Sequence, residues 1–216
     1  MGGLTGPILV ATRSAHKLEE IRRILAGVPI RIVGVDDLGL PELDEEADIE
    51  PFETFAANAL SKARYFHHRS GVPTLADDSG LCVDALEGGP GVRTRRFAPE
   101  EWAREWGRDE ANNRWLLECL KDVPTGKRGA HYRCAIAIVD DLEHATFEGR
   151  VEGTIGLEPR GAGGFGYDPL FHPGGGDATY AELPPETKES TSHRAHALRA
   201  AVPALLAIAD GSSGPS

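Results

Sequence analysis

Thr74-Leu75-Ala76-Asp77-Asp78-Ser79-Gly80-Leu81 is the stretch around which the rest of the sequence is organised. The apolar run from Val72 to Ala76 predicts a buried strand, and two carboxylates, a hydroxyl and a glycine follow it. Because ligands bind at strand ends in α/β sheets, this order places Asp77 and Asp78 at the mouth of a cleft. A simple turn is the alternative interpretation, since Asp, Ser and Gly all favour turns.

The composition limits the classes of protein to consider. The chain has 216 residues, 40% of them hydrophobic, and a net charge of −11, which suits one large α/β domain or two small ones. The negative charge argues against polymeric nucleic acid as a partner, although carboxylates can bind a divalent cation that bridges to phosphate. We expect no membrane-spanning helix and no signal peptide. Three widely spaced cysteines favour a cytoplasmic protein.

The spacing of apolar residues predicts an α/β fold. Strands are predicted at 8–12, 31–35, 72–76, 130–139 and 144–155, and helices at 15–25, 54–69, 110–121 and 195–209. Strands and helices alternate early and strands pair later, which predicts a mixed twisted sheet flanked by helices, with two lobes and a central substrate cleft. We expect residues 1–209 to form one two-lobed domain and the small polar tail 210–216 to be disordered.

The loop from Thr12 to Lys17 lies where the first predicted strand leads into the first predicted helix. Backbone N–H groups and the helix dipole favour anions at such a position. Thr12, Ser14 and Lys17 add two hydroxyls and a cation, but the loop lacks the glycines of a Walker loop. Phosphate binding is one interpretation, and an ordinary serine-capped helix with a solvated lysine is the other.

The segment from Glu42 to Glu53 is acidic and holds seven carboxylates. Such charge runs are usually solvated, and although one carboxylate could be a metal ligand, spacing alone does not identify it. In the helix predicted at 54–69, Asn58 and Lys62 share a face because they are four residues apart. A solvent-facing lysine is the ordinary interpretation of that pair.

Glycines dominate the loop from Gly161 to Pro169, with four in the first six residues. Such a segment is a poor helix or strand but allows a ligand to approach the backbone closely. Phe165 and Tyr167 are candidate stacking surfaces for that ligand, or they anchor the loop to the core. The run of Arg93, Arg95 and Arg96 (residues 93–96) likewise indicates either an anionic ligand or an ion-paired surface.

Six stretches follow one another between about residue 8 and residue 206, nearly the whole chain. Together they resemble the inosine triphosphate pyrophosphatase family, whose members hydrolyse non-canonical purine nucleoside triphosphates such as dITP and XTP. Each stretch alone is a weak signal, whereas all six in family order are highly specific. They are Ala11-Thr12-x-Ser14-x-x-Lys17-x-x-Glu20; Thr54-Phe55-x-x-Asn58-Ala59-x-x-Lys62-Ala63; Ala76-Asp77-Asp78-Ser79-Gly80-Leu81-x-Val83-Asp84-Ala85-Leu86; Gly88-x-Pro90-Gly91-Val92; Gly163-Gly164-Phe165-Gly166-Tyr167-Asp168-Pro169-x-Phe171; and Ala181-Glu182-Leu183 with Lys188 and Ser192-His193-Arg194.

The resemblance implies that a nucleoside triphosphate and water give the monophosphate and pyrophosphate, with Mg²⁺ as cofactor and a homodimer as the assembly. It makes Asp78 the catalytic general base, Glu50 and Asp78 the metal ligands, and Asp77 a supporting partner. The residues that would bind the triphosphate are Thr12, Arg13, Ser14, Ala15, His16, Lys17, Lys62 and Ser79. The residues that would bind the purine are Phe165, Gly166, Tyr167, Asp168, Lys188, His193 and Arg194.

Selectivity for the base is expected from a hydrogen-bond donor. Hypoxanthine and xanthine carry an acceptor oxygen at C6, where adenine carries an amino group. A donor such as the Arg194 side chain or the His193 backbone would accept the first two bases and leave the adenine amine unpaired.

The sequence departs from the family pattern at three places. Ser14 replaces the usual Asn, Ala57 replaces a Glu, and Arg95 is an extra cation. Two other functions remain open at this point: a nucleotide-binding module that has lost catalysis, and a related pyrophosphatase with another base preference. The presence of both Glu50 and Asp78 favours the enzyme over the inactive module.

Overall fold

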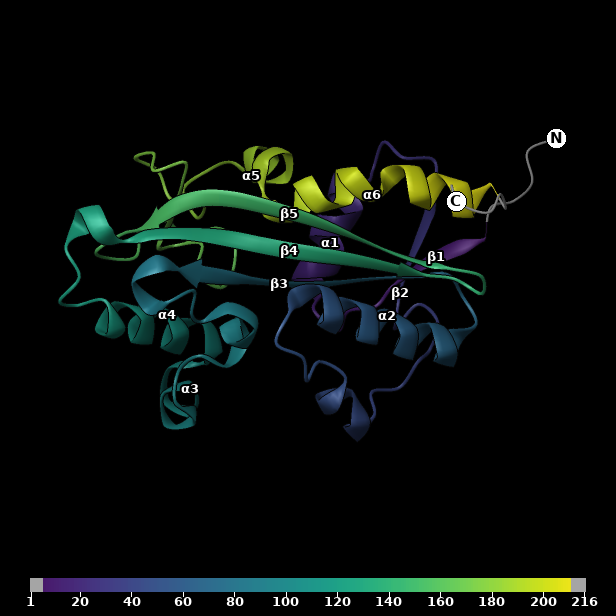
Figure 1. Ribbon diagram of the computed structural model, residues 1–216, viewed down its shortest axis with the longest axis horizontal. Coiled ribbons are helices and arrows are strands. Elements are labelled where there is room, and N and C mark those ends of the chain that lie inside the picture. Colours follow the sequence, from purple (N-terminus) through teal and green to yellow (C-terminus); the bar gives the residue numbers. More distant parts are fainter. Residues whose placement is uncertain (1–5, 211–216) are drawn as a thin grey trace. The chain divides into compact units, whose positions relative to one another are not determined.

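The computed structural model describes residues 6–210 (Figure 1). The tail predicted to be disordered lies outside the described residues from residue 211 onward, and Asp210 directly follows the last helix. Among the residues that the structure describes, no helix combines the length and the hydropathy that a bilayer crossing requires.

Six strands, six α-helices and four short 3₁₀ helices make up the part of the chain that the structure describes. The strands are β1 (Pro7–Val10), β2 (Arg31–Gly34), β3 (Thr74–Val83), β4 (Gly129–Val139), β5 (His144–Ile155) and β6 (Phe171–Pro173) in the described residues. The α-helices of the same part are α1 (Ala15–Ile24), α2 (Phe55–Ser70), α3 (Glu100–Trp106), α4 (Arg108–Cys119), α5 (Pro185–Thr191) and α6 (His193–Ala209). The 3₁₀ helices there are Asp44–Asp48, Asp84–Leu86, Gly91–Arg96 and Thr125–Lys127.

The strands form one mixed sheet in the order β2-β1-β3-β4-β5-β6. Strand β1 pairs in parallel with β2, where Leu9 faces Val33, and with β3, where Val10 faces Leu75. Strand β6 pairs antiparallel with β5, where Ile155 faces Phe171. The prediction of an α/β fold with a mixed sheet and flanking helices is confirmed.

The chain divides into two compact units. Unit 1 comprises the residues up to Asp78, residues 134–149 and the residues from Arg194 onward. Unit 2 comprises residues 79–133 and 150–193. The boundary falls between Asp78 and Ser79 inside β3, so each unit is described by itself. The predicted cleft between two lobes stays a prediction.

Unit 1 has helices on both faces of its strands, with α1 and α6 on one side and α2 on the other (Figure 1). Because side chains alternate along a strand, Ile8 and Val10 pack toward α1 and α6. The buried side chains of that core include Ile21 and Leu25 from the first helical segment, Leu75, Ile136 and Ile138 from the strands, and Leu198 and Leu205 from α6. The opposite helix, α2, buries Phe55, Ala59, Ala63 and Phe66 at helical spacing, as its sequence predicts.

Unit 2 has a separate core that is rich in aromatic side chains. The rings of Phe171 and Tyr180 contact Tyr132, and the Tyr132–Phe171 centroids lie 4.7 Å apart in an edge-to-face arrangement. Leu116 and Leu120, at the end of α4, are fully buried in the same cluster. In Figure 1, α3 and α4 lie on one side of the strands of this unit and α5 lies on the other.

The structure corrects two predictions about element boundaries. Strand β3 does not end at Ala76 but runs through Asp77, Asp78, Ser79 and Gly80 to Val83, so the turn interpretation is wrong. A carboxylate can lie inside a buried strand where cations from other segments neutralise it, and Asp77 has such partners.

The other correction concerns the C-terminal half of the chain. His193 and Arg194 form the first turn of α6 rather than preceding it. Helices α3 and α5 and strand β6 are short, with seven, seven and three residues, and they were not predicted. Elements of this length carry too few apolar repeats to be recognised from the sequence.

We expect Leu205→Ala to lower the free energy of unfolding by about 2–5 kcal/mol, because Leu205 is fully buried and its removal leaves a cavity. Urea denaturation followed by circular dichroism measures this change. Leu142→Ala is the matched control, since Leu142 is 75% exposed and its truncation should change stability by less than about 0.5 kcal/mol. Equal losses in the two variants would contradict the assignment of this core.

Candidate functional site

Asp77 lies at the centre of a buried ion cluster in unit 1. Its Oδ2 atom accepts hydrogen bonds from Nε and Nη2 of Arg194 at 3.2 and 2.9 Å, and Nζ of Lys17 lies 3.1 Å away. The Nη1 atom of Arg194 donates to Glu20 at 2.7 Å. The side chains of Asp77 and Arg194 are each only 1% exposed and that of Glu20 is 5% exposed, so these three charges compensate one another away from solvent, with the partly exposed Lys17 at the edge of the cluster.

The cluster keeps Asp77 ionised. Burial by itself would raise the pKa of Asp77, but the positive charges of Lys17, Arg194 and Lys62 outweigh it and hold the pKa well below its usual range. A carboxylate of this kind is a poor proton acceptor. Asp77 is therefore suited to holding Lys17 and Arg194 in place rather than to acid–base chemistry.

Asp78 has a different environment, although it is the next residue along β3. Its Oδ2 atom accepts a hydrogen bond from Nδ2 of Asn58 at 3.0 Å. Burial raises the pKa of Asp78 to about 6, and the charges of Lys62 and Lys17 offset that effect only in part. A carboxylate with a pKa near neutrality is suited to accepting a proton from water.

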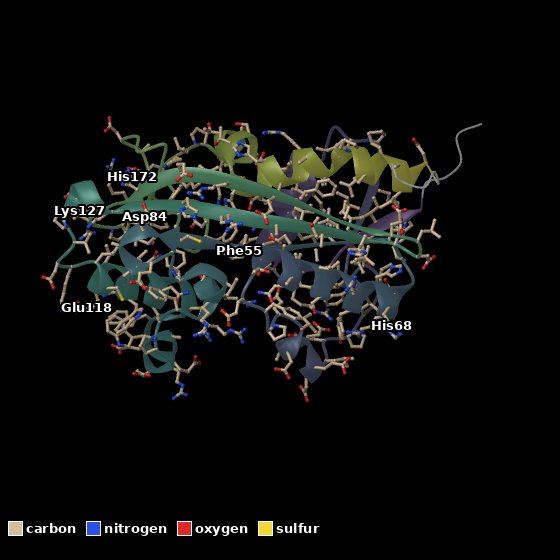
Figure 2. The ribbon with its side chains drawn as sticks, viewed as in Figure 1. Phe55, His68, Asp84, Glu118, Lys127 and His172 are labelled. Atoms are coloured by element: carbon tan, nitrogen blue, oxygen red, sulfur yellow. The ribbon has the colours of Figure 1, made fainter. Side chains whose placement is uncertain are left out.

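Helix α2 supplies the partners of Asp78 and of the acidic segment. Figure 2 labels Phe55 and His68 near the two ends of this helix. Asn58 and Lys62 are four residues apart on one face, and Lys62 forms an ion pair with Glu50. Burial lowers the pKa of Lys62, but the charges of Glu50, Asp77 and Asp78 more than restore it, so the ammonium stays charged. The lysine is 9% exposed, which overturns the solvent-facing interpretation.

The β1–α1 loop has the local geometry of a helix N-terminus. Ser14 is the N-cap of α1, and its Oγ accepts from the backbone N–H of Lys17 at 3.4 Å. The backbone N–H of Ser14 donates to Oγ1 of Thr12 at 3.1 Å. Ala15 and His16, in the first turn, are exposed. An exposed first turn at a helix start, with Lys17 in it, makes this loop suitable for an anion.

The side chain of Arg13 points to the acidic segment of unit 1. Its Nε and Nη2 atoms donate to the two carboxylate oxygens of Glu46 at 3.0 and 2.7 Å, and Nη1 donates to Leu40 O at 2.9 Å. Arg69, from the end of α2, donates to the same carboxylate at 2.8 Å. The guanidinium of Arg13 therefore fastens the acidic segment to the β1–α1 loop, whereas the sequence placed it on the triphosphate.

In unit 2, Lys188 and the glycine-rich loop meet around Asp168. The Oδ2 atom of Asp168 accepts from the backbone N–H of Phe165 at 2.8 Å and from Nζ of Lys188 at 2.5 Å. The same ammonium lies 4.5 Å from the centroid of the Phe165 ring. Gly166 is held by two side chains, since its N–H donates to Asp109 and its C=O accepts from Asn113. Three of the predicted purine-binding side chains are thus brought together.

Three other predicted site residues make contacts within the chain. Tyr167 is 3% exposed in the core of unit 2, and its hydroxyl donates to Thr94 O at 2.8 Å, so its ring anchors the loop. The ring of His193 stacks on Tyr132 at 4.6 Å. The guanidinium of Arg194 faces Asp77 and Glu20 in unit 1, whereas the sequence placed it on the base edge. Ser79, in β3, is 9% exposed.

Sequence reasoning gave no role to Asn58 or Glu20, although both belong to the quoted stretches. Asn58 contacts Asp78, and Glu20 contacts Arg194. For Glu20 a signal existed in the sequence, because a glutamate three residues after Lys17 lies on the same helix face. Its partner Arg194 is 174 residues away in sequence, so no local pattern could identify the pair.

The described residues contain no group of three or more His, Cys, Asp or Glu side chains placed to hold a metal ion. The predicted ligands Glu50 and Asp78 form a set of two, and both lie close enough to Lys62 to affect its pKa. Mg²⁺ commonly takes one or two carboxylates and completes its shell with water and substrate phosphates. The donor set therefore fits Mg²⁺ bound together with a phosphorylated ligand.

The two adjacent aspartates should respond oppositely to substitution by asparagine in metal-free protein. The pKa of Asp78 is about 6 in the folded chain against about 3.9 unfolded, so ionised Asp78 destabilises the fold above pH 6. Asp78→Asn should raise the free energy of unfolding at pH 7.5 by about 1–3 kcal/mol, and the gain should disappear as the pH falls from about 6 to about 4. Urea denaturation in the presence of a chelator measures it.

Asp77→Asn is the matched comparison. The pKa of Asp77 is lowered by folding, so its stabilisation is present above about pH 4 and is lost as the pH falls below that value. Its removal takes this carboxylate from Lys17 and leaves Arg194 with Glu20 alone, which should cost about 3–5 kcal/mol at pH 7.5. Changes of the same sign in both variants would contradict the described electrostatics.

Comparison with known proteins places the chain in a family. The sequence profile of the Ham1 family matches residues 8–204. A dITP/XTP pyrophosphatase of Nocardia farcinica is 50% identical over 208 residues, covering 94% of this chain and 96% of the relative. One of Porphyromonas gingivalis is 46% identical over 192 residues, covering 88% of this chain and 93% of the relative.

Solved structures agree with the sequence comparison. A HAM1 protein from Coxiella burnetii superposes with a TM-score of 0.78 at 34% identity, covering 93% of this chain and 98% of that one. A nucleoside-triphosphatase and dITP/XTP pyrophosphatase from Mycobacterium abscessus gives a TM-score of 0.70 at 43% identity, covering 91% and 99%. Because the family profile and these relatives each span most of the chain, this protein belongs to the Ham1 family.

Proposed function

We propose that this protein hydrolyses non-canonical purine nucleoside triphosphates, namely ITP, dITP and XTP, to the monophosphate and pyrophosphate, and so cleanses the nucleotide pool. The observation that carries the proposal is the pair of adjacent aspartates in β3. Asp77 holds cations, while Asp78 has a pKa of about 6 and is held by Asn58. Family membership and the activity named for the relatives support the same reaction.

Asp78 acts as the general base. It removes a proton from the attacking water as the new oxygen–phosphorus bond forms and the bond between the α- and β-phosphates breaks, which releases pyrophosphate. The N-terminus of α1 and the ammonium of Lys17 bind the negatively charged phosphates. Lys62 places a further buried positive charge beside Asp78 and Glu50. The energy needed to desolvate these groups is provided by folding, so they are oriented before the substrate arrives.

Glu50 and Asp78 would hold Mg²⁺, as the donor set indicates. The ion supplies charge neutralisation for the phosphates and for the leaving pyrophosphate when it is bound. The chain's own contribution is to direct both carboxylates, through Lys62 for Glu50 and Asn58 for Asp78.

Selectivity for the base rests on unit 2. Phe165 offers an aromatic ring for stacking, and Lys188 offers a charged donor beside it, held by Asp168. A 6-oxo purine accepts a hydrogen bond from such a donor, whereas adenine presents an amino group and leaves it unpaired. Lys188 is proposed as this donor in place of the Arg194 side chain expected from the sequence, because the Arg194 guanidinium faces two carboxylates of unit 1.

The assembly and the cellular location complete the proposal. A homodimer is expected from the resemblance to the inosine triphosphate pyrophosphatase family. Removal of faulty nucleotides from the pool that serves polymerases is a task of the cytoplasm. The three cysteines, which form no disulfide in the structure, suit that reducing compartment.

The products formed from inosine, xanthosine, adenosine and guanosine triphosphates test the reaction. We expect monophosphate and pyrophosphate from the first two, only with Mg²⁺, and a loss of at least about 1,000-fold in kcat for Asp78→Asn, because the variant has no base. Phosphorus NMR identifies the products. Diphosphate and orthophosphate would show that another bond is cut. Binding without turnover would instead establish the inactive nucleotide-binding module.

Lys188→Met tests the basis of selectivity. Loss of the donor should lower kcat/KM for inosine triphosphate by about 10- to 100-fold, the loss expected for one buried hydrogen bond to a charged group, and should leave the low value for adenosine triphosphate unchanged. Steady-state kinetics with both nucleotides measure the ratio. Lys121→Met is the control, because Lys121 pairs with Glu118 on the exposed surface of the same unit. An unchanged ratio in Lys188→Met would remove Lys188 from base recognition.

A further inference from the structure

Asn58 uses its side-chain amide at three points in unit 1. Oδ1 accepts from the backbone N–H of Phe52 at 2.8 Å, and Nδ2 donates to Phe52 O at 3.1 Å and to Oδ2 of Asp78 at 3.0 Å. The residue is 2% exposed. If the amide were flipped, Oδ1 would face Phe52 O and the Asp78 carboxylate, which are both acceptors. The hydrogen-bond pattern therefore fixes the orientation of the amide.

The bonds to Phe52 close a small ring that holds the backbone of the acidic segment. Phe52 lies two residues after Glu50, and both its N–H and its C=O are engaged by the one side chain. One helical turn further along α2, Lys62 forms an ion pair with Glu50 itself. The segment is therefore fastened to α2 at two points, at Phe52 and at Glu50 itself, the residue expected to bind the metal.

The third bond of Asn58 extends this arrangement to β3. Because Nδ2 reaches both Phe52 O and Asp78, the position of the Asp78 carboxylate is fixed relative to the segment that carries Glu50. An amide directs the carboxylate without adding a positive charge. Asp77 shows the contrast, since the cations Arg194 and Lys17 bind its carboxylate and neutralise it. Asn58 thus fixes where the Asp78 carboxylate lies by a neutral hydrogen bond.

We propose that Asn58 is a positioning residue that holds the carboxylates of Glu50 and Asp78 in the mutual arrangement required to bind the divalent cation. This inference rests on the proposed function for its catalytic consequence. Loss of a group that orients metal ligands typically costs about 10- to 100-fold in metal affinity or activity. A residue that only stabilised α2 would lower stability and leave metal binding in the folded protein unchanged.

Asn58→Leu removes the three hydrogen bonds and keeps a similar volume. We expect the affinity of the free protein for Mn²⁺, a probe for Mg²⁺, to fall about 10- to 100-fold in titration calorimetry. With inosine triphosphate, kcat at fixed Mg²⁺ should fall by a similar factor, while KM at saturating Mg²⁺ should change by less than about threefold, because the groups that bind nucleotide are untouched.

Asn112→Leu is the matched control. Asn112 is also a buried asparagine that bonds to backbone groups, at Ala98 N, Thr94 O and Arg95 O, but in unit 2 and without a carboxylate partner. We expect both variants to lose thermal stability and only Asn58→Leu to lose Mn²⁺ affinity. Both are assayed well below their melting temperatures, so that each is folded.

The outcomes separate this inference from the proposed function. Wild-type affinity for Mn²⁺ in folded Asn58→Leu, or equal loss in both variants, would overturn the positioning role. If the wild type releases no pyrophosphate, the proposed reaction fails, yet the calorimetric comparison still decides whether Asn58 organises the cation site. If Asp78→Asn is inactive while Asn58→Leu keeps full kcat and full Mn²⁺ affinity, the proposed reaction stands and the positioning role does not.

Discussion

The buried ion cluster around Asp77 is the interaction on which unit 1 depends. It joins β3, α1 and α6 through Asp77, Lys17, Glu20 and Arg194, from three segments far apart in sequence. Burying any one of these charges alone would cost several kcal/mol, so none is tolerated without the others. The buried carboxylate of Asp77 in β3 is therefore stable only when α1 and α6 are both packed beside the strand and supply Lys17 and Arg194.

The same constraint explains how two adjacent aspartates acquire different chemistry. Successive residues of a strand point to opposite faces, so Asp77 meets the cations of α1 and α6 while Asp78 meets Asn58 of α2. Cations lower the pKa of Asp77, and burial raises the pKa of Asp78. A reactive carboxylate costs stability, and the neighbouring ion cluster offsets that cost within the same strand.

Much of the local structure could be predicted from the sequence, because long elements repeat their apolar residues often enough to reveal a period. The predicted strand at 144–155 matches β5, and the predicted helix at 54–69 matches α2 within one residue at each end. The predicted end of β3 was wrong, because Asp-Asp-Ser-Gly has the composition of a turn, whereas Lys17 and Arg194, the cations that neutralise Asp77 inside the strand, are distant in sequence. Arg13 and Arg194 were expected on the substrate, yet carboxylates from other segments hold both side chains.

The sequence by itself determined the family and the types of group available for chemistry, because ordered short stretches are a property of the chain alone. It also determined which carboxylates and cations are present. Only the tertiary structure decided their roles. Whether a carboxylate is a base or a counter-ion depends on burial and on the charges within a few ångströms of it, and the charge of Arg194 beside Asp77 comes from a segment 117 residues away. No local sequence pattern shows which distant residue will lie beside a given carboxylate. The difference in pKa between Asp77 and Asp78 therefore exists only in the folded protein.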